Sequence, residues 1–211
     1  MHTSLRRTRF ICSLALLFLL SACAATQKLS DEDRRKISVV RIDSNVPKAP
    51  AMYYLGPGTG ALFAFGAIGG AVIAASSLEP AKALQDFAEK NGIFIERIAF
   101  QEIDAAIRRS GKLKVSDSGE ANEATMRMVV YMYGFSIPNG FSSNLVPVLH
   151  VKCEMVDAAG KVVWIADEGV SLLSSPAAPM TPEAMRDDPK RIEEAWRSAA
   201  KRVAETIARD L

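Results

Sequence analysis

The amino-terminal end of the chain limits which residues can belong to the mature fold. Three arginines within residues 6–9 precede an uncharged run over residues 10–20, and the small residues Ser21 and Ala22 follow. This is the layout of a secretory signal, which is removed after export. The apolar run has 11 residues, whereas a helix needs about 20 to cross a bilayer, so a permanent transmembrane anchor is the poorer interpretation. The fold is therefore expected to form from residues 23–211, after cleavage of a signal peptide.

The end of this signal has a more specific pattern. Its last residues and the one that follows are Leu20, Ser21, Ala22 and Cys23. They resemble the lipobox of bacterial lipoproteins, which a dedicated peptidase reads and cleaves before a lipid-modified cysteine. The resemblance implies that Cys23 becomes the first mature residue and carries diacylglycerol, with a further acyl chain such as palmitate on its amine in Gram-negative cells. An ordinary secretory signal with a chance cysteine at its end is the alternative.

The resemblance also implies a location. In this class an aspartate directly after the cysteine commonly retains the protein in the inner membrane, and this chain has Ala24 there. We therefore expect a lipid anchor in the outer membrane, on its periplasmic face, in preference to the inner membrane or a Gram-positive cell surface. Two or more acyl chains hold a protein stably at a membrane, because each buried methylene contributes about 0.8 kcal/mol.

Charge and cysteine content exclude several classes of protein. Cleavage would remove three arginines and no acid, so 23 of 26 basic residues remain against 24 acidic ones. Nucleic-acid binding depends on excess positive charge, and no nucleic-acid partner is expected. Cys12 would leave with the signal and Cys23 would carry lipid, so Cys153 would have no intramolecular disulfide partner. The length fits one domain.

The mature chain divides into two parts. Residues 23–35 combine the lipidated cysteine with a small, polar and charged sequence, which predicts a flexible tether. Residues 36–211 are expected to form a periplasmic domain. Their patterns predict strands over 36–43, 112–116, 124–137, 148–156 and 161–167, with a turn over 157–160. A loop is predicted over 53–60, and a helical region over 80–111 that is interrupted near Gly92. A loop with Pro176, Pro179 and Pro182, as a spacer or a polyproline II strip, precedes a helix that begins at Pro189.

This order predicts a single α+β domain, with a largely antiparallel sheet of four to five strands and helices packed on one face. Residues 107–115, with the sequence IRRSGKLKV, are similar in outline to the periplasmic domains of the curli-secretion lipoprotein and of the Tol amino-terminal domain. In those domains a helix ends at a Ser-Gly or similar pair and enters a strand. The likeness concerns pattern and covers about 80 residues.

No group of residues predicts catalysis. His150 and Cys153 are three apart on an expected strand, so their side chains would point to opposite faces and could not form a nucleophile pair. Cysteine and histidine are too few for a zinc site, and the clustered acids are expected to be solvated. The glycines of residues 56–60 lack the Gly-Lys-Ser/Thr ending of a phosphate loop. We expect no enzyme, no cofactor and no metal; an enzyme that uses carboxylates alone on envelope polymers is the alternative.

An apolar, glycine-rich segment over residues 56–77 is the least explained part of the chain. It contains Gly66, Gly69 and Gly70, and the spacing of the first and third lets two helices approach closely. Burial against the sheet, docking of a partner or a second copy, and insertion into a membrane are three open interpretations. Its strongly apolar part, residues 61–75, would make about 22 Å of helix, which is short for a membrane span.

Together these features predict a lipid-anchored lipoprotein with a non-enzymatic binding or scaffolding role at the outer membrane. Its partners would be the membrane, through the lipid, and an envelope protein or a second copy. The alternative is a subunit of an oligomeric envelope secretion or transport complex, in which residues 56–77 contact membrane or neighbouring subunits.

Overall fold

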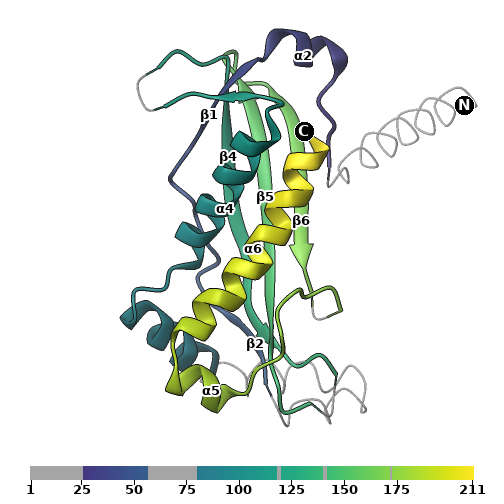
Figure 1. Ribbon diagram of the computed structural model, residues 1–211. Coiled ribbons are helices and arrows are strands. Elements are labelled where there is room, and N and C mark those ends of the chain that lie inside the picture. Colours follow the sequence, from purple (N-terminus) through teal and green to yellow (C-terminus); the bar gives the residue numbers. More distant parts are fainter. Residues whose placement is uncertain (1–25, 57–79, 118–119, 140–141, 172) are drawn as a thin grey trace, which may run out of the picture.

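The computed structural model describes residues 26–56, 80–117, 120–139, 142–171 and 173–211 (Figure 1). Leu20, Ser21, Ala22 and Cys23 of the expected cleavage site, and Gly66, Gly69 and Gly70 of the apolar segment, lie outside these residues. The elements are α2 (Asp31–Lys36), β1 (Val39–Ile42), β2 (Tyr53–Leu55), α4 (Ile95–Ser110), β3 (Lys114–Val115), β4 (Ala124–Ser136), β5 (Val146–Asp157), β6 (Val162–Val170), α5 (Pro182–Asp187) and α6 (Lys190–Asp210). Residues 80–90 are also helical.

One sheet of six strands organises the domain. Its order is β3-β1-β4-β5-β6, and β2 also pairs with β4. The long pairs β4–β5 and β5–β6 are antiparallel, whereas β1 and β2 run parallel to β4. β1 pairs with the first residues of β4 and β2 with its last, so two short strands share one edge of a long one. The predicted α+β class and the predicted hairpin are confirmed.

The predicted number of strands is wrong. The sheet has six strands where four to five were predicted, because Tyr53–Leu55 forms β2 where a loop was predicted. Glycine and proline around this segment favour a loop, but β4 offers its free backbone edge, and aromatic residues suit a strand. Tertiary pairing therefore decides the conformation of these three residues.

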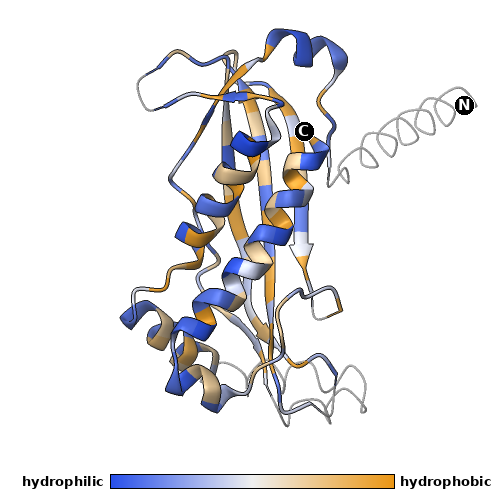
Figure 2. Cartoon of the chain, viewed as in Figure 1, coloured by the Kyte–Doolittle hydropathy of each residue, from blue (hydrophilic) through white to orange (hydrophobic). Residues whose placement is uncertain are grey.

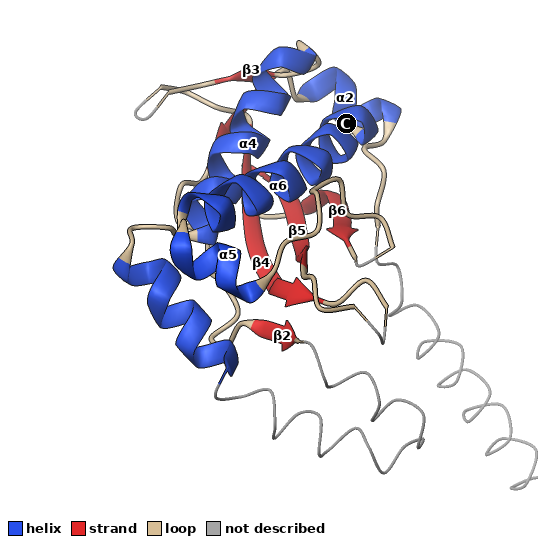
Figure 3. Cartoon of the chain, turned by 60° about the horizontal axis from the view of Figure 1, so that its bottom comes forward, coloured by secondary structure: helices blue, strands red, loops and turns tan. Residues whose placement is uncertain are grey.

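Two long helices cover one face of the sheet. α4 and α6 pack against each other, α4 also packs on β4, and α6 packs on β5 and β6 (Figures 1 and 3). Their apolar residues recur at helical spacing and turn toward the strands (Figure 2). Gly92 and Gly111 both have positive φ, at 74° and 65°, so they interrupt and end the helical region as predicted. Helices on one face are confirmed.

The segment predicted as a flexible tether is held against the domain. Gln27 exchanges both backbone hydrogen bonds with Ile165 of β6, at 2.8 and 2.9 Å, and Leu29 is 5% exposed. The Ser30 hydroxyl accepts a hydrogen bond from the Asp33 amide and so caps α2. The prediction of a tether over residues 23–35 is wrong from Gln27 onward, because the edge of β6 provides backbone partners and Leu29 fills an apolar site.

The connection between the sheet and α6 also differs from its prediction. Thr181 accepts a hydrogen bond from the Ala184 amide and caps α5, with Pro182 in the first turn. Pro182 is therefore helical and cannot continue a polyproline strip with Pro176 and Pro179. The Asp188 side chain accepts a hydrogen bond from the Lys190 amide at the start of α6.

Different elements lie at the two ends of the domain. α2 and the last turn of α6 lie at one end, and β2, α5 and the helical residues 80–90 lie at the other (Figure 1). β2 and residues 80–90 flank the apolar segment in the sequence. Within the described part of the chain, no helix is both long enough and apolar enough to span a membrane.

The surroundings of Gly134 leave no room for a side chain, so even a methyl group there should lower the stability of the domain. Its φ is +144°, and a Cβ there would lie 1.8 Å from the Tyr53 carbonyl oxygen on β2. We expect Gly134→Ala to destabilise the domain by about 3 kcal/mol in urea unfolding, because backbone strain and overlap add. Gly160→Ala is the matched control, since its φ is +83° and nothing lies within 4 Å of the added atom. Equal losses for the two variants would contradict this account of β2.

Candidate functional site

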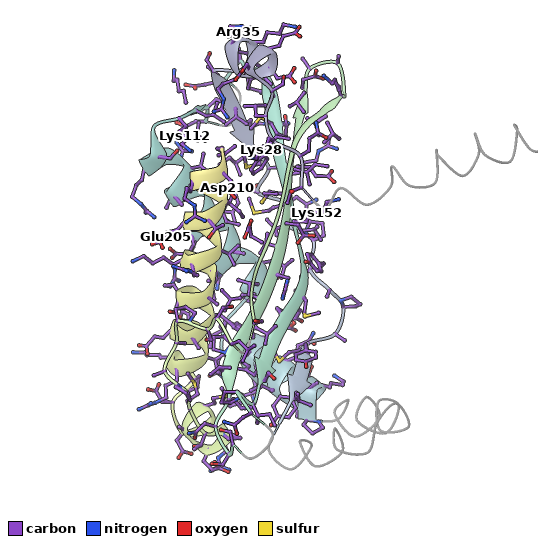
Figure 4. The ribbon with its side chains drawn as sticks, turned by 90° about the vertical axis from the view of Figure 1, so that its right-hand side faces the viewer. Lys28, Arg35, Lys112, Lys152, Glu205 and Asp210 are labelled. Atoms are coloured by element: carbon purple, nitrogen blue, oxygen red, sulfur yellow. The ribbon has the colours of Figure 1, made fainter. Side chains whose placement is uncertain are left out.

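The sheet has a second face that turns away from α4 and α6. Along β4, β5 and β6, buried residues alternate with partly exposed ones, so the partly exposed ones share this second face. Figure 4 shows Lys152 on this side of the sheet and the helices on the other. We call this surface the open face, and it comprises Arg127, Val129, Tyr131, His150, Lys152, Glu154, Ile165 and Asp167.

A β-bulge shapes the middle of the open face. The register between β4 and β5 shifts between Val130 and Met132, next to His150. Such a bulge changes which way the following side chains point. Tyr131 lies on the open face with 42% of its surface exposed. The bulge turns Tyr133 inward, where it is 1% exposed and packs against Trp196 of α6.

Three side chains from three strands meet at this bulge. The Tyr131 hydroxyl donates a hydrogen bond of 2.6 Å to Asp167 Oδ1 on β6. The Tyr131 hydroxyl oxygen also lies 3.3 Å from His150 Nδ1 on β5. The centres of the Tyr131 and His150 rings are 5.7 Å apart. The His150 ring lies against Gly169, where a Cβ would come within 2.3 Å of Nδ1. Tyr131 is thus exposed and also fixed in one orientation.

The protonation of Tyr131 limits its chemistry. Burial, together with the hydrogen bond to Asp167, raises the pKa of Tyr131 to about 12. The phenol therefore stays protonated at neutral pH and acts as a hydrogen-bond donor, which makes it a poor base or nucleophile there. Tyr131 is therefore suited to contacting and orienting a bound molecule through its ring and its hydroxyl group.

The prediction that His150 and Cys153 cannot meet is confirmed. His150 lies half-buried on the open face, and Cys153 is fully buried on the helical side. Burial raises the pKa of the Cys153 thiol to about 12, so the reactive thiolate is scarce at neutral pH. Within the described residues, no three histidine, cysteine or acidic side chains gather as a metal site.

Charges of both signs surround Tyr131. Lys152 Nζ lies 2.7 Å from Glu154 Oε1, and Glu154 is opposite Arg127 in the register. Lys152 is opposite Asp167 on β6. A shallow groove of about 420 Å³ borders these charges. It is lined by Asp43, Asn45, Pro47, Arg127, Met128, Val129, Lys152 and Glu154.

Antiparallel sheets often leave one face in solvent, so exposure alone does not mark a site. The distinguishing feature is a large aromatic side chain that is both exposed and held by two polar partners. The sequence pattern predicted a surface position for His150 but missed Tyr131 and Asp167. An aromatic residue at an outward position of a strand was the available signal.

No protein-family model matches this chain, and no curated protein matches it. Several solved structures resemble it in outline, among them the following two. A DUF330 protein from Xanthomonas campestris is 15% identical, with a TM-score of 0.39 over 53% of this chain and 57% of that one. This chain thus spans little more than half of that neighbour. A dodecameric PelC variant from Paraburkholderia phytofirmans is 13% identical, with a TM-score of 0.37 over 82% of this chain and 88% of that one. At these values the likeness says nothing about partners.

Proposed function

We propose that this chain is a lipid-anchored cell-envelope protein whose α+β domain binds another envelope protein through the open face, without catalysing a reaction. The outer membrane, facing the periplasm, is the proposed location, and Cys23 is the proposed lipid-bearing residue. The observation that carries the binding role is Tyr131, exposed and yet fixed by Asp167 and His150.

A fixed, exposed tyrosine suits a binding surface for two physical reasons. Tyrosine is enriched at the centres of interfaces, where it combines apolar area with a polar end. Because Tyr131 already has one orientation, binding would cost less side-chain entropy than for a free side chain. The alternating charges of Arg127, Glu154 and Lys152 would favour a partner with the complementary arrangement.

The absence of catalysis is part of the proposal. Support comes from the protonated state of Tyr131 and from the burial of Cys153, which make these two side chains poor nucleophiles at neutral pH. Turnover of an envelope polymer that disappears on changing one acid, for example Asp167→Asn, would overturn it.

Site-specific photocrosslinking in intact cells tests the binding role. We expect a photoreactive residue at Val129, beside Tyr131, to give one crosslinked product of defined mass. A second substitution, Tyr131→Ala, should reduce its yield at least several-fold, because the central contact is lost. A photoreactive residue at Arg186, which is exposed on α5, is the matched control and should not give this product. Equal yields at the two positions, or no effect of Tyr131→Ala, would contradict the proposal.

The second candidate function is a subunit of an oligomeric secretion or transport complex with residues 56–77 as its contact. It is favoured by the position of the elements that flank this segment, which lie at the end opposite α2 (Figure 1). A monomer in detergent, by size measurement, would contradict this alternative.

A further inference from the structure

The docked amino-terminal segment determines how far the domain can move from its anchor. Backbone hydrogen bonds between Gln27 and Ile165 fix the chain at the outer edge of β6. The Gln27 side-chain amide also donates a hydrogen bond to the Val162 carbonyl, at 3.3 Å. Leu29 is buried two residues later. From Gln27 onward the chain therefore belongs to the folded domain.

Only residues 24–26 separate Cys23 from this fixed point. Four residue steps, even fully extended, reach about 14 Å. This inference rests on the proposed function, in which Cys23 carries lipid. The edge of β6 must then stay within about 14 Å of the membrane surface. The Debye length at physiological salt is about 8 to 10 Å, so charges at that edge would interact with charged headgroups whenever this linker is less than fully extended.

We propose that the surface around this edge faces the membrane and binds anionic lipid headgroups through its basic side chains. A hollow of about 480 Å³ lies there, between the amino-terminal segment, β6 and the end of α6. Its charged lining, which we call the anchor-side surface, consists of Lys28, Arg34, Lys112, Arg209, Glu168 and Asp210. Lys28 and Lys112 both lie toward the α2 end of the molecule (Figure 4).

The charge balance of this surface favours an anionic partner. Four cationic side chains face two acids, whereas the mature chain as a whole is nearly neutral. Lys112 Nζ donates a 2.5 Å hydrogen bond to the Arg209 carbonyl, which joins the end of α4 to the end of α6. Burial and the neighbouring Asp210 raise the pKa of Glu168.

Basic residues at helix ends have a simpler role, because they complement the helix dipole. Arg34 and Arg209 each lie in the last turn of a helix. Lys28 precedes α2 and has no such role. All four basic residues remain exposed, so complementing a dipole does not prevent contact with phosphate.

Amine footprinting on vesicles tests the orientation. A maleimide lipid would be attached to Cys23 of the chain over residues 23–211; the buried Cys153 would not react. On vesicles containing phosphatidylglycerol, we expect acetylation of Lys28 and Lys112 to slow at least several-fold relative to the unlipidated chain. Lys190, exposed at the start of α6, is the internal control and should be unchanged. Equal rates for all three lysines would overturn the proposed orientation.

A double substitution tests whether the basic side chains of the anchor-side surface bind anionic headgroups. Lys28→Glu combined with Arg34→Glu should remove most of the protection of Lys112, with an unchanged circular dichroism spectrum. Protection that is as strong on pure phosphatidylcholine vesicles would overturn the role of anionic headgroups. Because the lipid is attached chemically, these results do not depend on whether cells acylate Cys23. Fatty-acid labelling in cells tests that separately.

Discussion

Replacing Trp196 with alanine is expected to destabilise the domain by about 3 to 5 kcal/mol. Trp196 is 1% exposed and is the central contact between α6 and the sheet. Its ring stacks on Phe135 at 5.6 Å and meets the edge of Tyr133 at 5.9 Å. The indole N–H donates a hydrogen bond to the Gly134 carbonyl, at 3.4 Å. Alanine would leave a cavity at the junction of the two layers and would remove the indole donor from the Gly134 carbonyl.

Urea unfolding of purified residues 24–211 measures this loss. Trp196→Phe keeps an aromatic ring but removes the N–H donor, so a smaller loss is expected. Lys201→Ala, an exposed change on the same helix, should alter stability by no more than about 0.5 kcal/mol. A loss below about 1 kcal/mol for Trp196→Ala would mean that α6 is held mainly by other contacts.

Local patterns predicted the parts of the fold that depend on local physics. The β5–β6 hairpin follows from strict alternation and a short turn, and α6 follows from a continuous apolar stripe. Gly111 was readable as a helix end because a left-handed residue is needed there. The Thr181–Pro182 start of α5 carried a comparable signal that the prediction did not use.

Long-range pairing could not be predicted in the same way. β2 has three residues, and only its register with the end of β4 makes it a strand. The docking of Gln27 depends on β6, more than 130 residues later in the chain. A polar sequence that reads as a tether can therefore become part of the domain when a sheet edge is free.

One irregularity in β4, the bulge after Val130, hides the burial of two aromatic residues from the sequence pattern. In β4, the positions of Met126, Met128 and Val130 are buried, and strict alternation would then expose Tyr133 and Phe135. The bulge after Val130 reverses the phase and buries both aromatic rings. Tyr131 is an outward position by alternation alone, but its meeting with His150 and Asp167 depends on the register of three strands, which the local pattern does not give. A change of phase within one apolar strand is a sequence signal of a bulge.

Cys23→Ser is expected to abolish fatty-acid labelling of the protein in cells. In the proposed function the thiol of Cys23 is the point of acylation, and a serine hydroxyl cannot form the thioether. Intact-mass measurement should show that the wild-type chain begins at Cys23 with added lipid, and that the variant lacks this lipid. Cys12→Ser, in the expected signal, and Cys153→Ser, in the core, are matched controls that should keep full labelling. Labelling that survives Cys23→Ser would contradict lipidation at this residue.

If Cys23 is acylated as proposed, the fold limits when this can occur. Gln27 reaches its final place only when β6 has formed, because its partners are Ile165 and Val162. Until then Gln27 has no partner on β6, and the chain around Cys23 could reach membrane-bound enzymes that acylate and cleave it. Once Gln27 is docked, about 14 Å of chain separates the cysteine from a folded domain, which would block such an enzyme sterically. We therefore expect acylation to precede folding, so that a refolded chain supplied from solution would be a poor substrate compared with the newly exported one.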